Sequence, residues 1–108
     1  MNQEFYIAGV KFHEASKIID KLEVGMQLHM EPEPSNKYDS NAVKLIFELE
    51  EINNIFPFML GYVPAKFSAQ ASALLLVSEN VICEIIEVNE REKPWKQIKV
   101  VVKEKTNA

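Results

Sequence analysis

Side chains along residues 5–12 and 43–49 alternate between two sets, a period typical of β-strands, in which successive side chains point to opposite faces. Residues 81–88 and 95–102 are runs rich in β-branched residues, which also favour strands. The predicted strands cover residues 5–12, 26–30, 43–49, 58–63, 81–88 and 95–102. A turn at residues 50–54 separates the third strand from the fourth, and a charged turn at residues 89–94 separates the fifth from the sixth. Each of these two pairs therefore predicts an antiparallel hairpin.

Two other segments have the spacing of short amphipathic helices. The first lies between residues 14 and 22, with apolar positions Ala15, Ile18, Ile19 and Leu22. Gly25 lies just beyond it, where a helix can end. The second is predicted to begin at Pro64, because proline lacks only an N–H that would be unpaired in the first turn. Its apolar face comprises Phe67, Ala71, Leu74 and Leu75.

Six short strands with two short helices predict a mainly β fold. A closed or partly closed β-barrel is favoured, because closure removes the exposed strand edges of a small sheet. The alternative that the pattern leaves open is an α+β sandwich. With 108 residues, of which 47% are apolar, the chain fits the size of one domain, and we predict a single domain over residues 1–108.

The composition also indicates the cellular compartment in which we expect the protein. The first twenty residues mix charged and apolar side chains, unlike a signal peptide, and no segment approaches the ~20 apolar residues of a membrane span. Cys83 is the only cysteine, which excludes an internal disulfide and a cysteine cluster for zinc. We therefore expect a cytoplasmic protein that contacts no membrane and holds no cofactor or metal.

The formal net charge of −4 argues against a protein that coats nucleic acid non-specifically, since such binding requires lysine and arginine along the phosphates. The charge is unevenly distributed, however. Residues 91–105 contain six basic and two acidic side chains, so this segment is locally +4 and the remainder of the chain is −8. The basic segment can attract a phosphate backbone locally and in a salt-sensitive way.

The segment from residue 31 to residue 43 has the least ordinary composition. Its sequence, EPEPSNKYDSNAV, combines two prolines, three acids, a tyrosine and two asparagines. Such a loop either shapes a turn or carries a site. By composition alone the first interpretation is the commoner one, with Asp39 and Asn41 bonded to the local backbone and Tyr38 covering the barrel.

The three acids of this segment, Glu31, Glu33 and Asp39, suggest a divalent-cation site of the kind that a nuclease uses. No lysine or histidine base has a suitable spacing, and solvated loop acids are far commoner, so a metal nuclease is not our prediction. Three further reactive side chains, His13, His29 and Cys83, share no spacing typical of metal ligands and are left without a predicted role. The cysteine is interpreted as a small core residue.

The same segment carries a resemblance to a known family. It matches the pattern EP.N.YD.NAV through Glu33, Pro34, Asn36, Tyr38, Asp39, Asn41, Ala42 and Val43. A GY.P pattern follows at residues 61–64, and the run IAGV precedes at residues 7–10. By these motifs the chain resembles the HIRAN family over nearly its whole length, in the stand-alone form found in bacteria.

The resemblance implies a small six-stranded OB-like β-barrel with two short α-helices. It also implies a non-catalytic module that captures the 3′ end of single-stranded DNA, in DNA repair or in the processing of stalled forks. The expected protein partner is a helicase or a nuclease, since the family also occurs within fork-remodelling helicase-like proteins. No enzyme activity is expected of the domain itself.

The resemblance also assigns residues to the DNA site. Tyr38 matches the side chain that stacks on the terminal base, and Asp39 matches the carboxylate that accepts a hydrogen bond from the 3′-hydroxyl. An aromatic face stacks on any base for roughly 1–3 kcal/mol, and an internal phosphate would be repelled by a carboxylate at short range. Tyr6 matches a second stacking tyrosine, and Trp95 falls near a further aromatic. The complete predicted site is Tyr6, Tyr38, Asp39, Asn41, Lys66 and Trp95.

The chain departs from the family pattern in its cations. Phe5 stands where the DNA-binding form has a basic residue, and Lys66 is the only cation near the start of the second helix. The lysines that could replace these phosphate contacts are Lys37, Lys44 and Lys93. The alternative function is a protein-interaction or regulatory domain that keeps the HIRAN fold but has lost DNA binding. The run Phe-Pro-Phe at residues 56–58 is either hairpin core or an exposed patch for self-association, and the sequence does not predict the oligomeric state.

Overall fold

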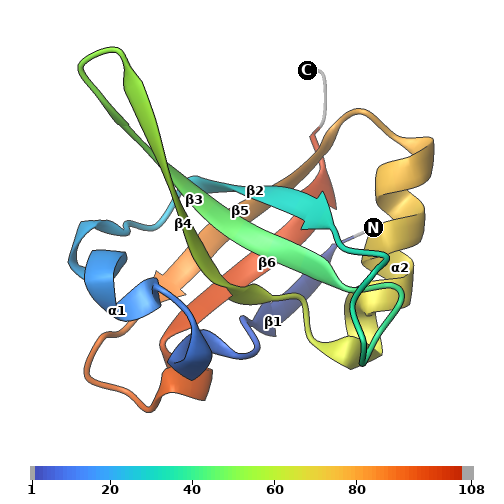
Figure 1. Cartoon of the computed structure of the whole chain (residues 1–108), viewed down its shortest axis with the longest axis horizontal. Coiled ribbons are helices and arrows are strands. Elements are labelled where there is room, and N and C mark those ends of the chain that lie inside the picture. The colour runs from blue at the N-terminus through green and yellow to red at the C-terminus, as the bar shows by residue number, and fades with distance from the viewer. Residues whose placement is uncertain (1, 106–108) are drawn as a thin grey trace.

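The computed structural model describes residues 2–105, which form one six-stranded antiparallel sheet with two α-helices (Figure 1). The strands are β1 (Gln3–Tyr6), β2 (Gln27–Pro32), β3 (Val43–Glu51), β4 (Asn54–Tyr62), β5 (Val81–Val88) and β6 (Ile98–Glu104). The α-helices are α1 (Ala15–Ile18) and α2 (Ala65–Val77), and the short 3-10 helices are η1 (Val10–Phe12), η2 (Ile19–Lys21) and η3 (Pro94–Lys96). The predicted mainly β fold with six strands and two short helices is confirmed.

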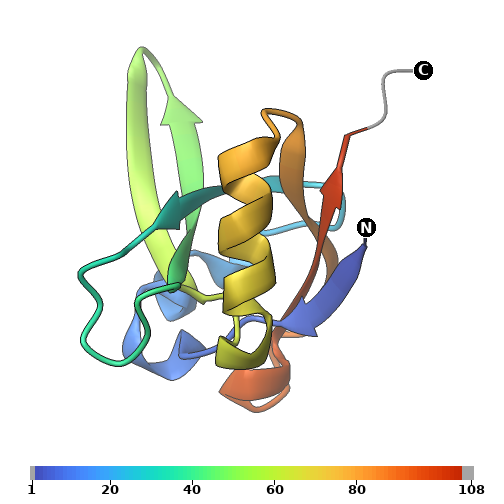
Figure 2. The same cartoon turned by 90° about the vertical axis from the view of Figure 1, so that its right-hand side faces the viewer.

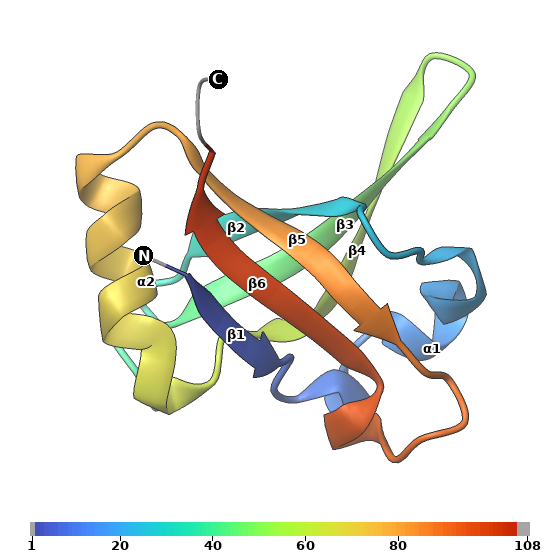
Figure 3. The same ribbon diagram turned by 180° about the vertical axis from the view of Figure 1, so that it is seen from behind.

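The sheet curves until its two edges meet at one point. Its strand order is β1-β6-β5-β2-β3-β4, so β1 and β4 are the edges, and the two halves of the sheet face each other (Figures 1 and 3). Just beyond β1, Ala8 forms an isolated bridge with Tyr62 of β4, in which each N–H donates to the other carbonyl at 2.9 Å. The sheet is therefore not fully closed, but it is compatible with a barrel-like OB fold.

Gly61 allows this close approach of the two edges. A Cβ at this position would lie 2.3 Å from the carbonyl oxygen of Ala8 and 2.7 Å from Cγ2 of Ile7. Such contacts are far inside van der Waals distance, so a side chain would push the edges apart. The glycine of the GY.P pattern is thus needed for the meeting of β1 and β4.

The core lies between the two halves of the curved sheet. It is built from the inward-facing positions of the alternating strands, since β3 buries Val43, Leu45 and Phe47 in turn. Cys83 of β5 is also buried there, as predicted, and its burial raises the pKa of the thiol to about 12. The cysteine is consequently an unreactive packing residue.

Two predicted boundaries near the N-terminus are wrong. The first strand ends at Tyr6 rather than at residue 12, because Gly9 has a φ of 74° and turns the chain into η1. The predicted helix at residues 14–22 is only one α-helical turn followed by η2, because the backbone leaves the helical region at Ile18, whose φ is −130°. The break allows the adjacent side chains of Ile18 and Ile19 both to be buried.

The two predicted hairpins are confirmed, with one correction in each. In the β5–β6 hairpin, Trp95 lies in η3 before the strand, because Pro94 begins a 3-10 turn closed by the Lys96 N–H on the Lys93 carbonyl. In the β3–β4 hairpin, the strands continue past the predicted ends to a tight turn at Ile52 and Asn53. This hairpin projects well beyond the body of the molecule (Figure 1).

Helix α2 lies beside the open side of the sheet next to β1 (Figure 2). Its Phe67 ring stacks on Phe5 of β1 with a centroid distance of 5.5 Å, and the Gln70 side chain accepts a hydrogen bond from the side chain of Gln3. Pro64 is the N-cap of the helix, so the helix begins one residue after the predicted start. Within residues 2–105, no helix is long and apolar enough to cross a membrane.

Candidate nucleic-acid interface

The loop between β2 and β3 is shaped by the side chain of Asn36. Its Oδ1 accepts the backbone N–H groups of Tyr38 at 2.9 Å and of Asp39 at 3.0 Å. Its Nδ2 donates to Oε1 of Glu33 at 2.8 Å. An asparagine side chain that takes the place of backbone partners in this way is typical of tight turns. Asn36 therefore determines where Tyr38 and Asp39 are held.

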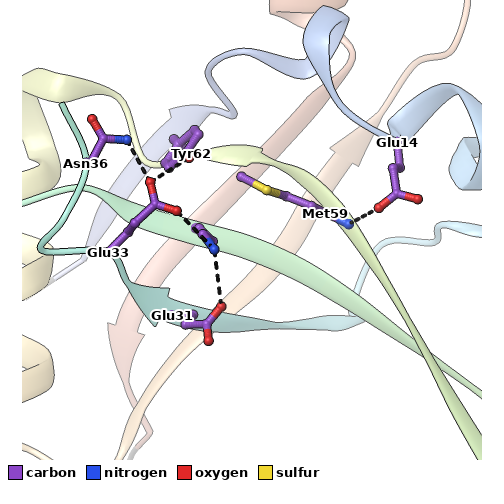
Figure 4. A network of polar contacts seen from close by, with 7 residues as sticks. Glu14, Glu31, Glu33, Asn36, Met59 and Tyr62 are labelled. Atoms are coloured by element: carbon purple, nitrogen blue, oxygen red, sulfur yellow. Dashed lines mark hydrogen bonds and ion pairs between the residues drawn. The ribbon is translucent and has the colours of Figure 1, made fainter. Parts of the chain in front are cut away.

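Glu33 connects this loop to the neighbouring strands (Figure 4). Besides Asn36, its carboxylate accepts hydrogen bonds from the hydroxyl of Tyr62 at 2.9 Å and from Nζ of Lys44 at 2.9 Å. The hydrogen bonds from Asn36, Lys44 and Tyr62 lower the pKa of Glu33 from 4.5 to about 2. Glu33 is thus ionised at neutral pH and ties the loop to β3 and β4.

Lys44 is fully engaged in the same network. It lies 2.9 Å from Glu33 and 3.8 Å from Glu31, and the hydrogen bond to Glu33 raises its pKa. Two carboxylates already balance this charge, so little of it is left for a phosphate. Of the lysines named as substitutes for the missing phosphate contacts, Lys44 is therefore the one that the structure disfavours.

The Asp39 carboxylate is held at both oxygens. Oδ1 accepts the backbone N–H of Asn41 at 2.9 Å, and Oδ2 accepts the hydroxyl of Ser68 at 2.6 Å. Ser68 lies near the start of α2 and is only 2% exposed, so the carboxylate is tied to a buried residue of the helix. Each carboxylate oxygen has a second lone pair, which leaves Asp39 able to accept a further hydrogen bond from a ligand.

Tyr38 and Asp39 border a hollow of about 210 Å³. The Tyr38 side chain is 96% exposed, so its ring is free to take a stacking partner. Tyr62, whose pKa is raised by burial, also forms part of the lining. The full lining consists of Ala8, Asn36, Tyr38, Asp39, Ala42, Tyr62, Val63 and Ala65. An apolar hollow with two phenol rings and one fixed carboxylate suits a flat ring that carries a hydroxyl donor.

The other predicted site residues lie outside this hollow. Tyr6, at the end of β1, has its hydroxyl 3.4 Å from Glu87 and its ring 5.6 Å from Nζ of Lys99. Trp95 borders a separate hollow on η3. Asn41 adjoins the site through its backbone N–H, which holds Asp39. The structure therefore brings Tyr38, Asp39 and the backbone of Asn41 together and leaves the two other aromatics apart.

Two cations, Lys37 and Lys66, are next in sequence to residues of this lining, and Lys66 was part of the predicted site. Lys66 is exposed, it follows the lining residue Ala65, and its Nζ lies 5.0 Å from the centroid of the Phe67 ring. Within residues 2–105, neither Lys66 nor Lys37 lies within 4.0 Å of a carboxylate. Both are therefore available to a phosphate, unlike Lys44.

Sequence reasoning missed two contributors to this site. Ser68 is a polar residue between the apolar positions of α2, and nothing in the local pattern links it to a loop 29 residues earlier. Ala8 enters the lining only because β1 and β4 meet, and its residue type carries no signal of its own. Tyr62 was visible in the GY.P pattern, although its hydrogen bond to Glu33 was not.

The acidic residues of the loop do not gather as metal ligands. Glu33 is directed to Lys44, Asn36 and Tyr62, whereas Asp39 is directed to Asn41 and Ser68. Across residues 2–105, no group of three His, Cys, Asp or Glu side chains is arranged to hold a metal ion. The arrangement thus offers no support for the metal-nuclease alternative.

Comparison with known proteins identifies the class to which this fold and site belong. The family model of the HIRAN domain matches residues 1–105, so the chain belongs to the HIRAN family. No curated protein and no solved structure matches the chain. Membership of this family supports a nucleic-acid-binding module in general.

Proposed function

We propose that this HIRAN domain captures the 3′ end of single-stranded DNA and catalyses no reaction. The observation that carries the proposal is the juxtaposition of an exposed ring, Tyr38, with a fixed carboxylate, Asp39, at the border of one apolar hollow. The Asp39 carboxylate and the backbone N–H of Tyr38 are held by hydrogen bonds from within the protein, so the carboxylate and the loop backbone are preformed. A preformed site loses less conformational freedom when its ligand binds.

The two residues divide the recognition between them. Tyr38 stacks on the terminal base, which needs no particular sequence because every base has a flat face. Asp39 accepts a hydrogen bond from the terminal 3′-hydroxyl. A phosphate in the same place would be an anion facing an anion and would offer no donor. Asp39 thus selects the end of a strand over its interior.

Few cations surround this end pocket, and this sets the expected strength of binding. Lys37 and Lys66 are the nearby cations without an ion-pair partner in the described chain, and the net charge of the protein is −4. We therefore expect modest affinity that falls with added salt. Within the cell, such a module would serve DNA repair or the processing of stalled forks together with a helicase or nuclease.

The test compares a 5′-labelled single strand with a free 3′-hydroxyl and the same strand with a 3′-phosphate, by fluorescence anisotropy at low salt. Wild-type protein is expected to prefer the hydroxyl end. Asp39→Asn should reduce this preference, whereas Asp20→Asn, at an exposed aspartate elsewhere, should not. Tyr38→Ala should weaken binding about 5- to 150-fold, the equivalent of one stacked base, and Tyr38→Phe should retain it.

Equal binding of both strands would contradict selection of the end by Asp39. No binding of either strand would favour the second candidate function, a protein-interaction or regulatory domain. The projecting β3–β4 hairpin is the observation behind that candidate. It exposes Ile52, Ile55 and Phe56, whereas Phe58 packs against the core.

A further inference from the structure

The β3–β4 hairpin projects from the sheet with exposed apolar side chains near its tip (Figure 1). Ile52 is 92% exposed, Ile55 57% and Phe56 44%, and none of the three belongs to the core or packs against it. None of them lines the end pocket either. Apolar side chains that gather in water on one projection mark a surface that contacts a partner. The proposed capture of a 3′ end gives this surface no role.

The charge around the tip restricts the kind of partner. Residues 48–58 contain three glutamates and no basic side chain. Two of these glutamates reach a lysine or histidine only at 4.0 Å, and within residues 2–105 Glu50 has no basic side chain within that distance. An anionic surface repels phosphates, and the tips of two copies would repel each other. The complementary partner is therefore both apolar and basic.

A hollow between η1 and η3 has the apolar character that this tip requires. It measures about 290 Å³ and is lined by Gly9, Val10, Lys11, Phe12, Pro94 and Trp95. Phe12 is 78% and Trp95 59% exposed, and neither ring belongs to the hydrophobic core or packs against it. Because a cavity of about 150 Å³ already accepts a benzene ring, this hollow has room for a side chain as large as Phe56.

The same surface carries net positive charge. Four cations lie in η1 and in the turn of residues 89–97, namely Lys11, Arg91, Lys93 and Lys96. Within residues 2–105, none of them lies within 4.0 Å of a carboxylate. The turn also contains Glu90 and Glu92, so four cations face two acids and the excess is two. The hollow therefore offers the acidic tip both apolar rings and opposite charge.

The tip and the hollow lie at opposite ends of the molecule, as the green hairpin and the orange turn show in Figures 1 and 3. A chain therefore cannot place its tip in its own hollow, whereas two copies can make this contact. The two surfaces are different, so each contact leaves one tip and one hollow unoccupied. Such a head-to-tail contact can be repeated along a row of copies.

We propose that the β3–β4 tip of one copy docks into the hollow between η1 and η3 of a second copy. Ile52, Ile55 and Phe56 of the tip then contact the two rings of the hollow, and the glutamates of the hairpin face its cations. One tip in one hollow is a small contact of the transient class, below ~1,200 Å², so we expect a Kd on the order of 100 µM. The inference goes beyond the proposed capture of a 3′ end and does not depend on it.

Sedimentation equilibrium of the full chain tests the self-association. For a Kd of this order, the weight-average mass should rise beyond that of a dimer as the concentration increases from about 10 µM to about 1 mM. The rise should be smaller at 0.15 M than at 0.01 M ionic strength, because the screening length falls from ~30 Å to ~8 Å. Glu50→Lys should abolish the rise.

Two control variants separate this contact from general effects on the surface. Glu23→Lys changes the net charge by the same amount as Glu50→Lys, at an exposed acid outside the hairpin. Leu76→Ser removes a side chain that is 85% exposed on α2. Both variants should associate like the wild type.

A mixture of two variants tests whether the contact is head-to-tail. The tip variant carries Glu50→Lys and Ile52→Ser, and the hollow variant carries Lys93→Glu and Trp95→Ala. All four positions are exposed, so circular dichroism and thermal unfolding should show both folds intact. Each variant alone should remain monomeric. The mixture should form a complex of one copy of each and nothing larger, because only one intact tip and one intact hollow are available to each pair.

The fluorescence of Trp95 locates the contact. Trp95 is the only tryptophan in the chain, so the hollow variant contains none and the mixture reports on the hollow of the tip variant alone. Adding the hollow variant should shift the Trp95 emission to shorter wavelength, as water is displaced from the ring. Adding hollow variant that also carries Glu50→Lys and Ile52→Ser should leave the emission unchanged.

Three outcomes would overturn the inference. The first is a wild type that stays monomeric up to about 1 mM at low ionic strength, since a Kd on the order of 100 µM requires association there. The second is association that persists in the tip variant or the hollow variant, which would assign it to another face such as α2. The third is an unchanged Trp95 emission in the mixture, whatever single-stranded DNA does to that emission. None of the three bears on capture of a 3′ end, which is measured with dilute protein.

Discussion

Strand β3 connects two regions that expose apolar surface in different ways. At its Val43 end lies the loop that holds Tyr38 and Asp39, and at its Glu51 end lies the tip of the projecting hairpin. Tyr38 is 96% exposed and Ile52 at the tip is 92% exposed, so exposure alone does not separate them. What separates them is the surrounding polar network. Glu33, Asn36 and Ser68 fix the loop, whereas within residues 2–105 no side chain of residues 52–55 forms a hydrogen bond or ion pair.

The hairpin is also protected against pairing with another strand. The main chain of Met59 faces outward from β4 and is already bonded to Glu14, both through its N–H and through its carbonyl. Pro57, two residues earlier on the same outward side, has no N–H to offer. The exposed edge of β4 thus lacks the regular row of donors that strand addition requires. The comparison of the loop between β2 and β3 with the hairpin tip thus shows that an exposed ring becomes a candidate site where fixed polar groups accompany it.

The largest effect is expected from Gly61→Ala, at the end of β4 that meets Ala8. The new Cβ would collide with the Ala8 carbonyl and separate β1 from β4, so we expect the free energy of unfolding to fall by about 3 kcal/mol or more. Gly25→Ala is the matched control, because Gly25 also has a positive φ, 97°, but has no atom near the new Cβ. It should cost only about 1–2 kcal/mol. Thermal unfolding followed by circular dichroism measures both, and equal losses would show that the meeting of the edges does not depend on Gly61.

Glu33→Gln tests the network without changing its shape. The glutamine cannot balance Lys44, and it accepts the hydrogen bonds of Asn36 and Tyr62 more weakly than a carboxylate does. We expect roughly 2- to 10-fold weaker binding of a 3′-hydroxyl strand, as for the loss of one hydrogen bond. The control is Glu31→Gln, which lies at the edge of the network, 3.8 Å from Lys44, and should change affinity less. An affinity of Glu33→Gln equal to that of wild type would mean that the loop keeps its shape without this charge.

The lowered pKa of Glu33 also predicts how the difference in stability between wild type and Glu33→Gln depends on pH. The pKa of Glu33 is lowered from 4.5 to about 2, so its ionised form stabilises the fold fully above the unfolded pKa. This contribution declines as the pH falls below about 4.5 and is lost as the pH passes through about 2. Urea unfolding between pH 3 and pH 6 should therefore show the difference between wild type and Glu33→Gln becoming smaller toward acid. A constant difference would argue against the lowered pKa.

The smallest effect is expected at the hairpin tip. Ile52→Ser removes an exposed apolar side chain that packs against no core residue, so stability should change by less than about 0.5 kcal/mol. Binding of a 3′-hydroxyl strand should not change in the anisotropy assay. A several-fold loss of affinity would place the hairpin within the binding surface and remove the distinction between the two regions.

The sequence predicted the elements whose signals are local. Alternating side chains, runs of β-branched residues and the turns between them located all six strands and both hairpins, because these signals lie within each element. The composition of residues 31–43 favours turns, and the turn is indeed local, although it is made by Asn36, which bonds residues only two and three positions away, rather than by Asp39 and Asn41 alone. The errors near the N-terminus fell where a single backbone angle redirected the chain, at Gly9 and at Ile18, and the predicted start of the sixth strand was wrong because Pro94 begins a 3-10 turn.

What the tertiary structure alone decided are the contacts between segments that are far apart in the sequence. The bond from Ser68 to Asp39, the bridge from Ala8 to Tyr62 and the hollow between Phe12 and Trp95 each join different elements. None of these contacts is visible as a periodicity in the sequence, because each partner follows the pattern of its own element and the pairing depends on how the sheet curves. The sequence by itself determined the strands and the residues that carry chemistry. The curvature of the sheet determined which of those residues share a pocket.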